Sequence, residues 1–171
     1  DPYSSSKAAS ELLINSYYES FFKDTKIMIA SARAGNVIGG GDWSKYRLFP
    51  DIIRSCFEEN ILEIRNPNSV RPWQHVLDPL FGYLSLAEKL STGVSKYCDG
   101  WNFGPENNAN TSVKEIIEII KSKGLNLKVK SPKKLYKEES KYLMLDIAKA
   151  KNNLDWHPKW DTKESIYKTI D

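Results

Sequence analysis

Hydrophobic residues at helical spacing predict a helix over residues 3–23. They fall on one face of a 3.6-residue repeat. The nearly all-apolar run at 27–33 comes next and predicts a strand that is covered on both faces. The apolar positions of the helix are Ala8, Leu12, Leu13, Tyr17 and Phe21.

The same alternation of helix and short strand continues along the chain. Helices are expected at 50–57, 80–90, 113–123, 146–154 and 162–170. Extended segments are expected at 62–65, 72–76, 101–104 and 125–129. Thr111 or Ser112 caps the third of these helices, with Glu115 in its first turn. The pattern predicts an α/β fold with at least some parallel strand pairing.

Length and composition narrow the class of protein. A chain of 171 residues with 40% hydrophobic and 27% charged residues can bury a real core. No apolar run approaches the roughly 20 residues that cross a bilayer, so no membrane partner is expected. Cys56 and Cys98 are too few and too far apart for a disulfide framework or a metal site, and the two histidines are isolated. A reduced, cytoplasmic setting without a bound metal is the expectation.

Lysines gather late in the chain, between Lys121 and Lys141, with Tyr136 and Tyr142 among them. They form either a basic surface for nucleic acid or a solvated, variable surface. A net charge of only +3 favours the second, so no nucleic-acid partner is expected.

A tyrosine and a lysine, Tyr3 and Lys7, lie one helical turn apart and share a helix face. An ammonium group near a phenol favours the phenolate, which can take a proton from a hydroxyl group while hydride leaves the same carbon. The small residues 4–6, 8 and 9 allow close approach of a ligand. The alternative is a chance spacing in a chain with 9 tyrosines.

Polar residues and glycines follow the first strand. Ligands of α/β proteins bind at the carboxyl ends of strands. Arg33 and Asn36 are placed to donate hydrogen bonds there, and the glycines at 39–41 let a ligand approach the backbone. The alternative is a surface turn. The glycines are followed by Asp-Trp-Ser, so they do not form the G-x-G-x-x-G dinucleotide fingerprint.

A second polar cluster lies at 65–75. Arg65 and Arg71 suit forked contacts with phosphate oxygens, although a solvent-facing arginine is the ordinary alternative. Trp73 either stacks on a base or fills the core. Further on, Asn102 lies beside a ligand or forms a turn.

Together these segments resemble the extended short-chain dehydrogenase/reductase family over nearly the whole chain. The segments that carry the resemblance are YSSSKAASE, RAGNVIGGGDW, LFPDIIR, IRNPNSVRPWQHVLDPL, GYLSLAEKL, WNFGP and DIAKAKNNLDWHPKW. RPWQHV marks a subgroup, because most relatives have Arg-Asp-Trp or Arg-Asp-Phe there.

The resemblance implies roles for individual residues in NAD-dependent chemistry on a nucleotide-linked sugar. Tyr3 matches the catalytic base and Lys7 the lysine at the nicotinamide ribose; both are catalytic and cofactor-binding. Ala34 and Val37 match positions near the nicotinamide. Substrate-binding positions are matched by Arg33, Asn36, Leu48, Ile64, Arg65, Arg71, His75 and Asn102, with Asn36 and Arg71 at the diphosphate.

The resemblance also implies how the chain is organised. Residues 1–35 hold the tyrosine helix and a late strand of a Rossmann-like sheet. Residues 36–171 are mostly the small substrate-binding subdomain, with 77–104 returning to the sheet. The family's phosphate loop for NAD lies upstream of these segments. We therefore expect the C-terminal portion of an enzyme whose N-terminal, NAD-binding half is a necessary partner.

Family dimers pack the tyrosine helix against a second copy, so a homodimer using residues 12–22 is expected. Two rival interpretations stay open. One is an epimerase or another dehydratase of the same family, and the other is a non-catalytic module that binds sugar nucleotides.

Overall fold

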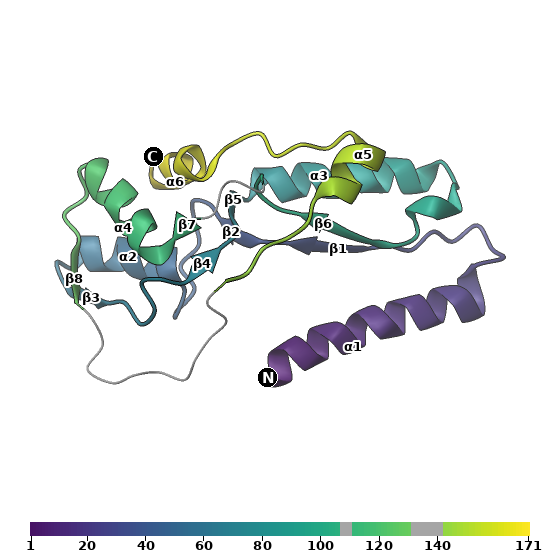
Figure 1. The fold of residues 1–171 in the computed structure, drawn as a ribbon, viewed down its shortest axis with the longest axis horizontal. Helices are drawn as coiled ribbons and strands as arrows, with labels where there is room; N and C mark the ends of the chain where they lie inside the picture. The colour runs from purple at the N-terminus through teal and green to yellow at the C-terminus, as the bar shows by residue number, and fades with distance from the viewer. Residues whose placement is uncertain (107–110, 131–141) are drawn as a thin grey trace.

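Two parallel strands, β1 (Ser31–Ala34) and β6 (Gly100–Phe103), lie between helices (Figure 1). The computed structural model describes residues 1–106, 111–130 and 142–171. Helix α1 (Pro2–Tyr17) runs along one side of the pair, while α3 (Leu77–Ser91) and α5 (Ala148–Leu154) cover the other. Helix α1 begins where the Asp1 side chain accepts a hydrogen bond from the Ser4 amide at 2.9 Å.

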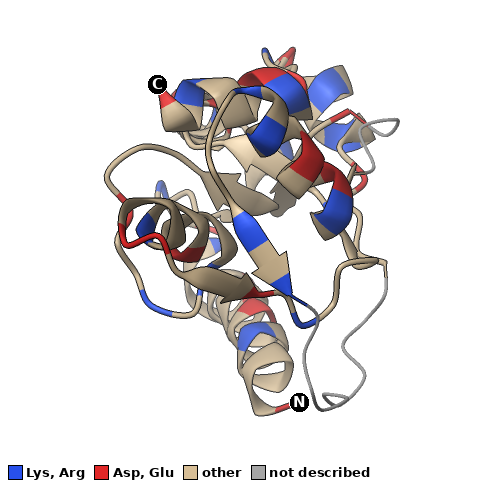
Figure 2. Ribbon diagram, turned by 90° about the vertical axis from the view of Figure 1, so that its left-hand side faces the viewer, with Lys and Arg blue, Asp and Glu red and all other residues tan. Residues whose placement is uncertain are grey.

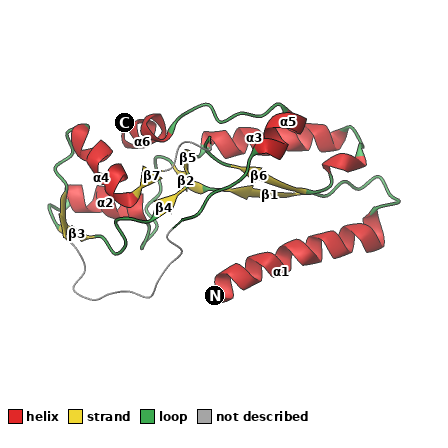
Figure 3. Ribbon diagram, viewed as in Figure 1, coloured by secondary structure: helices red, strands yellow, loops and turns green. Residues whose placement is uncertain are grey.

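The remaining strands form short pairs towards the other end of the molecule (Figure 3). The parallel pairs are β2 (Asn36–Ile38) with β5 (Trp73–His75) and β3 (Ile61–Glu63) with β8 (Lys128–Lys130). The antiparallel pair is β4 (Val70–Arg71) with β7 (Thr111–Ser112). The helices at this end are α2 (Leu48–Phe57), α4 (Val113–Ser122) and α6 (Thr162–Ile170). Two single turns, η1 (Tyr18–Phe22) and η2 (Ser95–Tyr97), complete the described elements.

The described residues pack into two hydrophobic clusters. One joins α2, α4 and α6 around Ile52, Ile116 and Ile166, none of which is exposed. The other joins α3, α5 and β6 around Phe103 and Trp156, whose rings meet edge to face at 5.0 Å. Burying these large apolar side chains is the main force that holds each group of elements together. The expected division at residues 35, 77 and 104 stays a prediction.

The α/β fold with parallel pairing is confirmed, and so are most helices. Helix α6 begins and ends at the predicted residues. Ser112 caps α4 through a complete capping box, because its hydroxyl accepts from the Glu115 amide while the Glu115 carboxylate accepts from the Ser112 amide.

Two predicted strands begin at least three residues later than expected. The strand expected at 27–33 begins only at Ser31, because its partner strand begins at Gly100. It is not covered on both faces, since Ala32 and Arg33 are exposed. The strand expected at 125–129 is Lys128–Lys130, because Gly124 turns the chain with φ +96° and Leu127 is still in a turn.

Candidate active-site cleft

A cleft of about 1270 Å³ lies between the N-terminal end of α1 and the α2 end of the molecule. Eight of the predicted site residues line it. They are Tyr3, Ala34, Asn36, Val37, Leu48, Ile64, Arg65 and Arg71. The cleft therefore brings together residues from both predicted polar clusters and from the tyrosine helix.

Tyr3 enters the cleft from the first turn of α1. Its side chain is 72% exposed, so the phenol is accessible. The Nζ of Lys7 lies 5.8 Å from the centre of the Tyr3 ring. The ammonium group thus lies over the face of the ring, in the range of a cation–π contact. Lys7 itself does not line the cleft.

The opposing wall is built where β1 passes into β2. Asn36 is the first residue of β2, and its amide donates to the Pro72 carbonyl at 2.8 Å. Gly35 lies so close to that carbonyl that a Cβ atom there would be 2.4 Å from the oxygen. This joint places Asn36 beside the strand that carries Arg71, so the two side chains assigned to one diphosphate lie on adjacent segments.

The far end of the cleft is partly apolar. Leu48 and Ile64 line it, and Phe49 beside them packs against Trp73 with ring centres 5.7 Å apart. Trp73 is only 6% exposed, so it fills the core rather than presenting a free face to a base. An apolar lining with a few polar groups is typical of small-molecule sites.

Three predicted substrate-binding residues lie outside the cleft. Arg33 and Asn102 are joined to each other, with Arg33 Nη1 donating to Asn102 Oδ1 at 3.0 Å. His75 is buried against Trp160 with ring centres 5.0 Å apart, and this burial lowers its pKa. Arg33 and Asn102 thus bond to other parts of the chain, whereas His75 Nδ1 accepts a hydrogen bond from the nearby Leu77 amide at 3.4 Å.

The cleft also contains charged residues that the sequence analysis did not select. Arg47 lines it at the start of α2, and Asp42 and Asp51 line it nearby. The Arg47 Nη1 atom lies 3.8 Å from Asp42 Oδ2. Only its position in the sequence points to Arg47, because it stands between the glycine-rich loop and the hydrophobic pattern that predicts α2.

The loop over residues 39–47 is held by one arginine of α2. Arg54 donates to the carbonyls of Trp43 at 2.9 Å and Ser44 at 3.2 Å, and it also contacts Asp51. Gly41 has φ +82° and Tyr46 has φ +65°, so the loop uses left-handed backbone at two positions. Most of the loop faces the cleft.

The residues that the resemblance assigns to NAD fit one end of that cofactor. Tyr3, the small Ala34 and Val37 share the cleft, and Lys7 lies next to Tyr3. Hydrogen-bonding groups beside small residues suit a nicotinamide and its ribose. The sequence contains no G-x-G-x-x-G loop for the phosphates. The chain thus offers groups for the nicotinamide end.

The late lysines do not form a uniformly basic face where they are described. Lys123 pairs with Asp171 at 2.8 Å and Lys130 with Glu63 at 3.7 Å. Basic and acidic segments are interspersed over the helices (Figure 2). Residues 131–141 of the predicted basic segment, including Tyr136 and Lys141, lie outside the described residues.

Within residues 1–106, 111–130 and 142–171, no helix is long and apolar enough to span a membrane. The same residues contain no group of three His, Cys, Asp or Glu side chains placed to hold a metal ion. A cytoplasmic location stays a prediction.

Comparison with known proteins gives consistent matches. A family model described as GDP-mannose 4,6 dehydratase matches residues 1–169. CDP-glucose 4,6-dehydratase of Salmonella typhimurium is 42% identical over 99% of this chain and 49% of its own length. dTDP-glucose 4,6-dehydratase of Streptomyces antibioticus is 30% identical over 99% of this chain and 48% of its own length. The chain therefore spans about half the length of the curated relatives it matches.

Solved structures share the fold at lower identity. A UDP-glucuronic acid 4-epimerase from Bacillus cereus, in complex with UDP-glucuronic acid and NAD, matches with a TM-score of 0.81 and 22% identity. That match covers 100% of this chain and 52% of the epimerase. A dTDP-glucose 4,6-dehydratase from Bacillus anthracis in complex with NAD gives a TM-score of 0.76 at 22% identity, over 99% of this chain and 51% of the dehydratase.

Proposed function

Because the chain belongs to the GDP-mannose 4,6 dehydratase family, we propose that it forms the sugar-nucleotide side of an NAD-dependent CDP-glucose 4,6-dehydratase. The observation that carries the proposal is the single cleft shared by Tyr3, Asn36 and Arg71. The proposed reaction needs a general base beside the sugar hydroxyl, and it needs an amide and a cation beside the diphosphate. The 42% identity to a CDP-glucose 4,6-dehydratase supports cytosine as the nucleobase of the substrate.

In the proposed reaction, Tyr3 removes the proton from the hydroxyl on the fourth carbon of the hexose. NAD, when bound, supplies the group that takes hydride from that carbon and later gives it to the sixth carbon. Between these events the proton on the fifth carbon and the hydroxyl on the sixth leave as water. A proton returns to the fifth carbon when hydride reaches the sixth, so the product is a 4-keto-6-deoxy sugar. Lys7 lies beside the Tyr3 ring, and Asn36 and Arg71 hold the diphosphate. We assign no residue of this chain to the loss of water.

Mass analysis of the products tests both the type of reaction and the nucleobase of the preferred substrate. The protein expressed from its own gene is incubated with NAD and, separately, with CDP-glucose, dTDP-glucose, UDP-glucose and GDP-mannose. We expect the loss of one water molecule, fastest from CDP-glucose. A faster reaction with another nucleotide sugar would contradict cytosine as the preferred nucleobase. A product with the same mass as the substrate would indicate an epimerase.

The exposed, partly apolar cleft also suits a module that binds without turnover. We propose that residues 1–171 alone bind CDP but convert no CDP-glucose, because the chain spans about half of its relatives and lacks the phosphate fingerprint. Calorimetry with CDP and a turnover assay on this chain alone test the proposal. If the natural protein also binds without turnover, the module interpretation holds.

We further propose a homodimer formed through α1. Leu12, Leu13 and Tyr17 are between 50% and 74% exposed on this helix, and Phe21 in the following turn is 65% exposed. Exposed apolar side chains that gather on one helix mark an interaction surface.

A further inference from the structure

We infer that Arg33 is a positioning residue: with Glu11 it fixes the tyrosine helix against β1 and so sets where the Tyr3 hydroxyl meets the sugar. This inference rests on the proposed function for its catalytic consequence. It replaces the substrate-binding role predicted for Arg33, which lies outside the cleft. We call the contact between the two side chains the Glu11–Arg33 fork.

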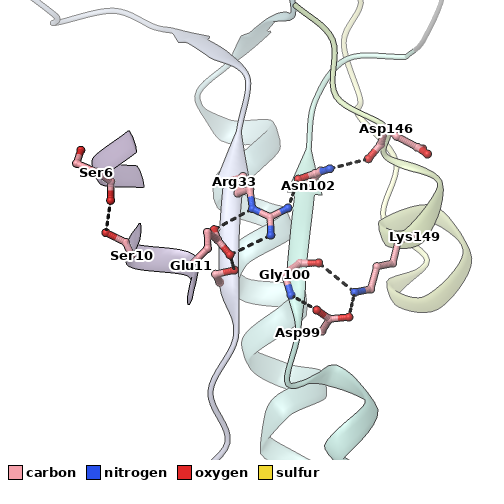
Figure 4. A network of polar contacts seen from close by, with 10 residues as sticks. Ser6, Ser10, Glu11, Arg33, Asp99, Gly100, Asn102, Asp146 and Lys149 are labelled. Carbon is pink, nitrogen blue, oxygen red and sulfur yellow. Dashed lines mark hydrogen bonds and ion pairs between the residues drawn. The ribbon is translucent and has the colours of Figure 1, made fainter. Parts of the chain in front are cut away.

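The fork is a two-point contact (Figure 4). Arg33 Nε donates to Glu11 Oε1 at 2.8 Å, and Arg33 Nη2 donates to Glu11 Oε2 at 2.9 Å. The Ser31 hydroxyl donates to the same Oε2 at 2.6 Å. Paired hydrogen bonds between a guanidinium and a carboxylate fix orientation as well as distance. Glu11 therefore joins α1 to two residues of β1 in one geometry.

The guanidinium is itself held from the neighbouring strand. Its Nη1 donates to Asn102 Oδ1 at 3.0 Å, and Asn102 Nδ2 donates to the Asp146 carbonyl at 3.1 Å. Gly100 leaves the space in which the guanidinium lies, since a Cβ atom there would be 2.0 Å from Arg33 Nη2. The strand pair thus presents Arg33 to α1 in a prepared orientation.

Helix α1 needs such a contact because its apolar packing against the described residues is slight. None of its residues is buried. Tyr18, in the turn after α1, is buried and anchors the end of the helix far from Tyr3. Glu11 is eight residues from Tyr3, which is about 12 Å along a helix. Of these two anchors, the fork is the one nearer the phenol.

The fork also connects the two walls of the cleft. Arg33 directly precedes Ala34, and Ala34, Asn36 and Tyr3 all line the cleft. A change in how α1 lies on β1 therefore changes the gap between the phenol and Asn36. Displacement of a reacting group by about 1 Å can slow catalysis roughly 100-fold.

Two variants break the fork by different routes. Glu11→Ala removes the carboxylate, whereas Gly100→Ala keeps both charges and displaces the guanidinium by its new Cβ. In the protein expressed from its own gene, we expect each to lower kcat with CDP-glucose roughly 10- to 100-fold. The Kd for CDP should stay within about twofold, because the cleft residues that hold the nucleotide are unchanged. Glu88→Ala is the matched control, since it removes an exposed carboxylate from α3 and not from α1.

Hydrogen exchange measures the position of α1 without turnover. An undocked helix of this length is marginal in water, so the amides of residues 5–10 should exchange several-fold faster in both variants, while those of α4 keep their rates. Unchanged exchange in α1 would overturn the inference, and so would faster exchange with an unaltered kcat. A parallel fall in kcat and CDP affinity would overturn it as well. If the wild-type protein converts no sugar nucleotide, the proposed function fails, and the exchange rates alone decide whether the fork docks the helix.

Discussion

Tyr3 is the residue on which the proposed chemistry depends most directly. Tyr3→Phe keeps the ring and removes the hydroxyl, so proton removal loses its base. A general base contributes about 10²- to 10⁴-fold, and we expect turnover of the natural protein with CDP-glucose to fall by at least about 100-fold. Steady-state kinetics checks this, with Tyr17→Phe on the same helix as the control. A rate within a few-fold of wild type would contradict the assigned role.

Arg71 is expected to act on binding and not on the chemical step. It lies on β4 at the cleft, where its Nη1 donates to the Val70 carbonyl at 2.9 Å. Hydrogen bonds to charged groups contribute about 1.5–3 kcal/mol, so Arg71→Gln should weaken CDP binding roughly 10- to 100-fold. Calorimetry measures the affinity, and Lys114→Gln is the control, because this exposed lysine of α4 does not line the cleft. An unchanged affinity would remove Arg71 from the nucleotide site.

Glu11 is expected to make the free energy of unfolding depend on pH in the acidic range. Hydrogen bonding from Arg33 holds the pKa of Glu11 at about 2, below the ordinary value of 4.5. Because the folded-state pKa is the lower one, the stabilisation is fully present above about pH 4.5 and is lost as the pH falls towards 2. The pair is partly exposed, so its contribution is about 1 kcal/mol or less.

Urea unfolding at pH 5.5 and pH 3 measures this effect. Glu11→Gln should lower the free energy of unfolding at pH 5.5 and have a smaller effect at pH 3, where part of the stabilisation is already lost in the wild type. An equal loss at both pH values would contradict the assignment.

Single-residue patterns identified the cleft better than they identified each role. Tyr3, Asn36 and Arg71 could be selected because their residue types follow from the chemistry. Arg33, His75 and Asn102 have the same residue types, but Arg33 and Asn102 hydrogen-bond to Glu11 and Asp146, and the His75 ring packs against Trp160; all three partners are distant in the sequence. A sequence alone does not say which partner a polar side chain meets.

At the scale of elements, the packing of α3 on β6 depends on one small residue. Gly82 faces the Phe103 ring, and a Cβ atom there would lie 2.3 Å from a ring carbon. Phe103 has no exposed surface and is held from another side by Trp156, so it has little room to move. Gly82→Ala should therefore destabilise the fold by about 1–3 kcal/mol through overpacking. Chemical denaturation checks this, with Glu88→Ala on the exposed side of α3 as the control.

Helices whose ends depend on residues within the helix were predicted well. Strands whose ends depend on a distant partner strand were not. The capping box of α4 and the extent of α6 follow from residues within each helix. The start of β1 depends on Gly100, nearly 70 residues later, so the apolar run at 27–33 misplaced it. Strand β2 was not predicted, because Asn36 and the glycines after it are residue types that also form turns.

On the scale of the whole molecule, the apolar side of α1 bears on assembly. Leu12→Glu would place a charge in the proposed dimer contact and should shift the natural protein from dimer to monomer, because burying an unpaired charge is costly. Sedimentation velocity measures the mass, with Glu118→Gln at an exposed position of α4 as the control. A wild-type protein that sediments as a monomer would contradict the dimer.

The joint between Gly35 and Pro72 has a consequence for how such a chain can diverge. It fastens the two strand pairs by backbone alone, and the residues on either side of it are the ones assigned to a single diphosphate. Any side chain at position 35 would push Asn36 and Arg71 apart while also opening the sheet. Selection for a folded protein and selection for a bound ligand therefore both act on the absence of a Cβ atom at Gly35. A substitution at this position is expected to change folding and ligand binding together.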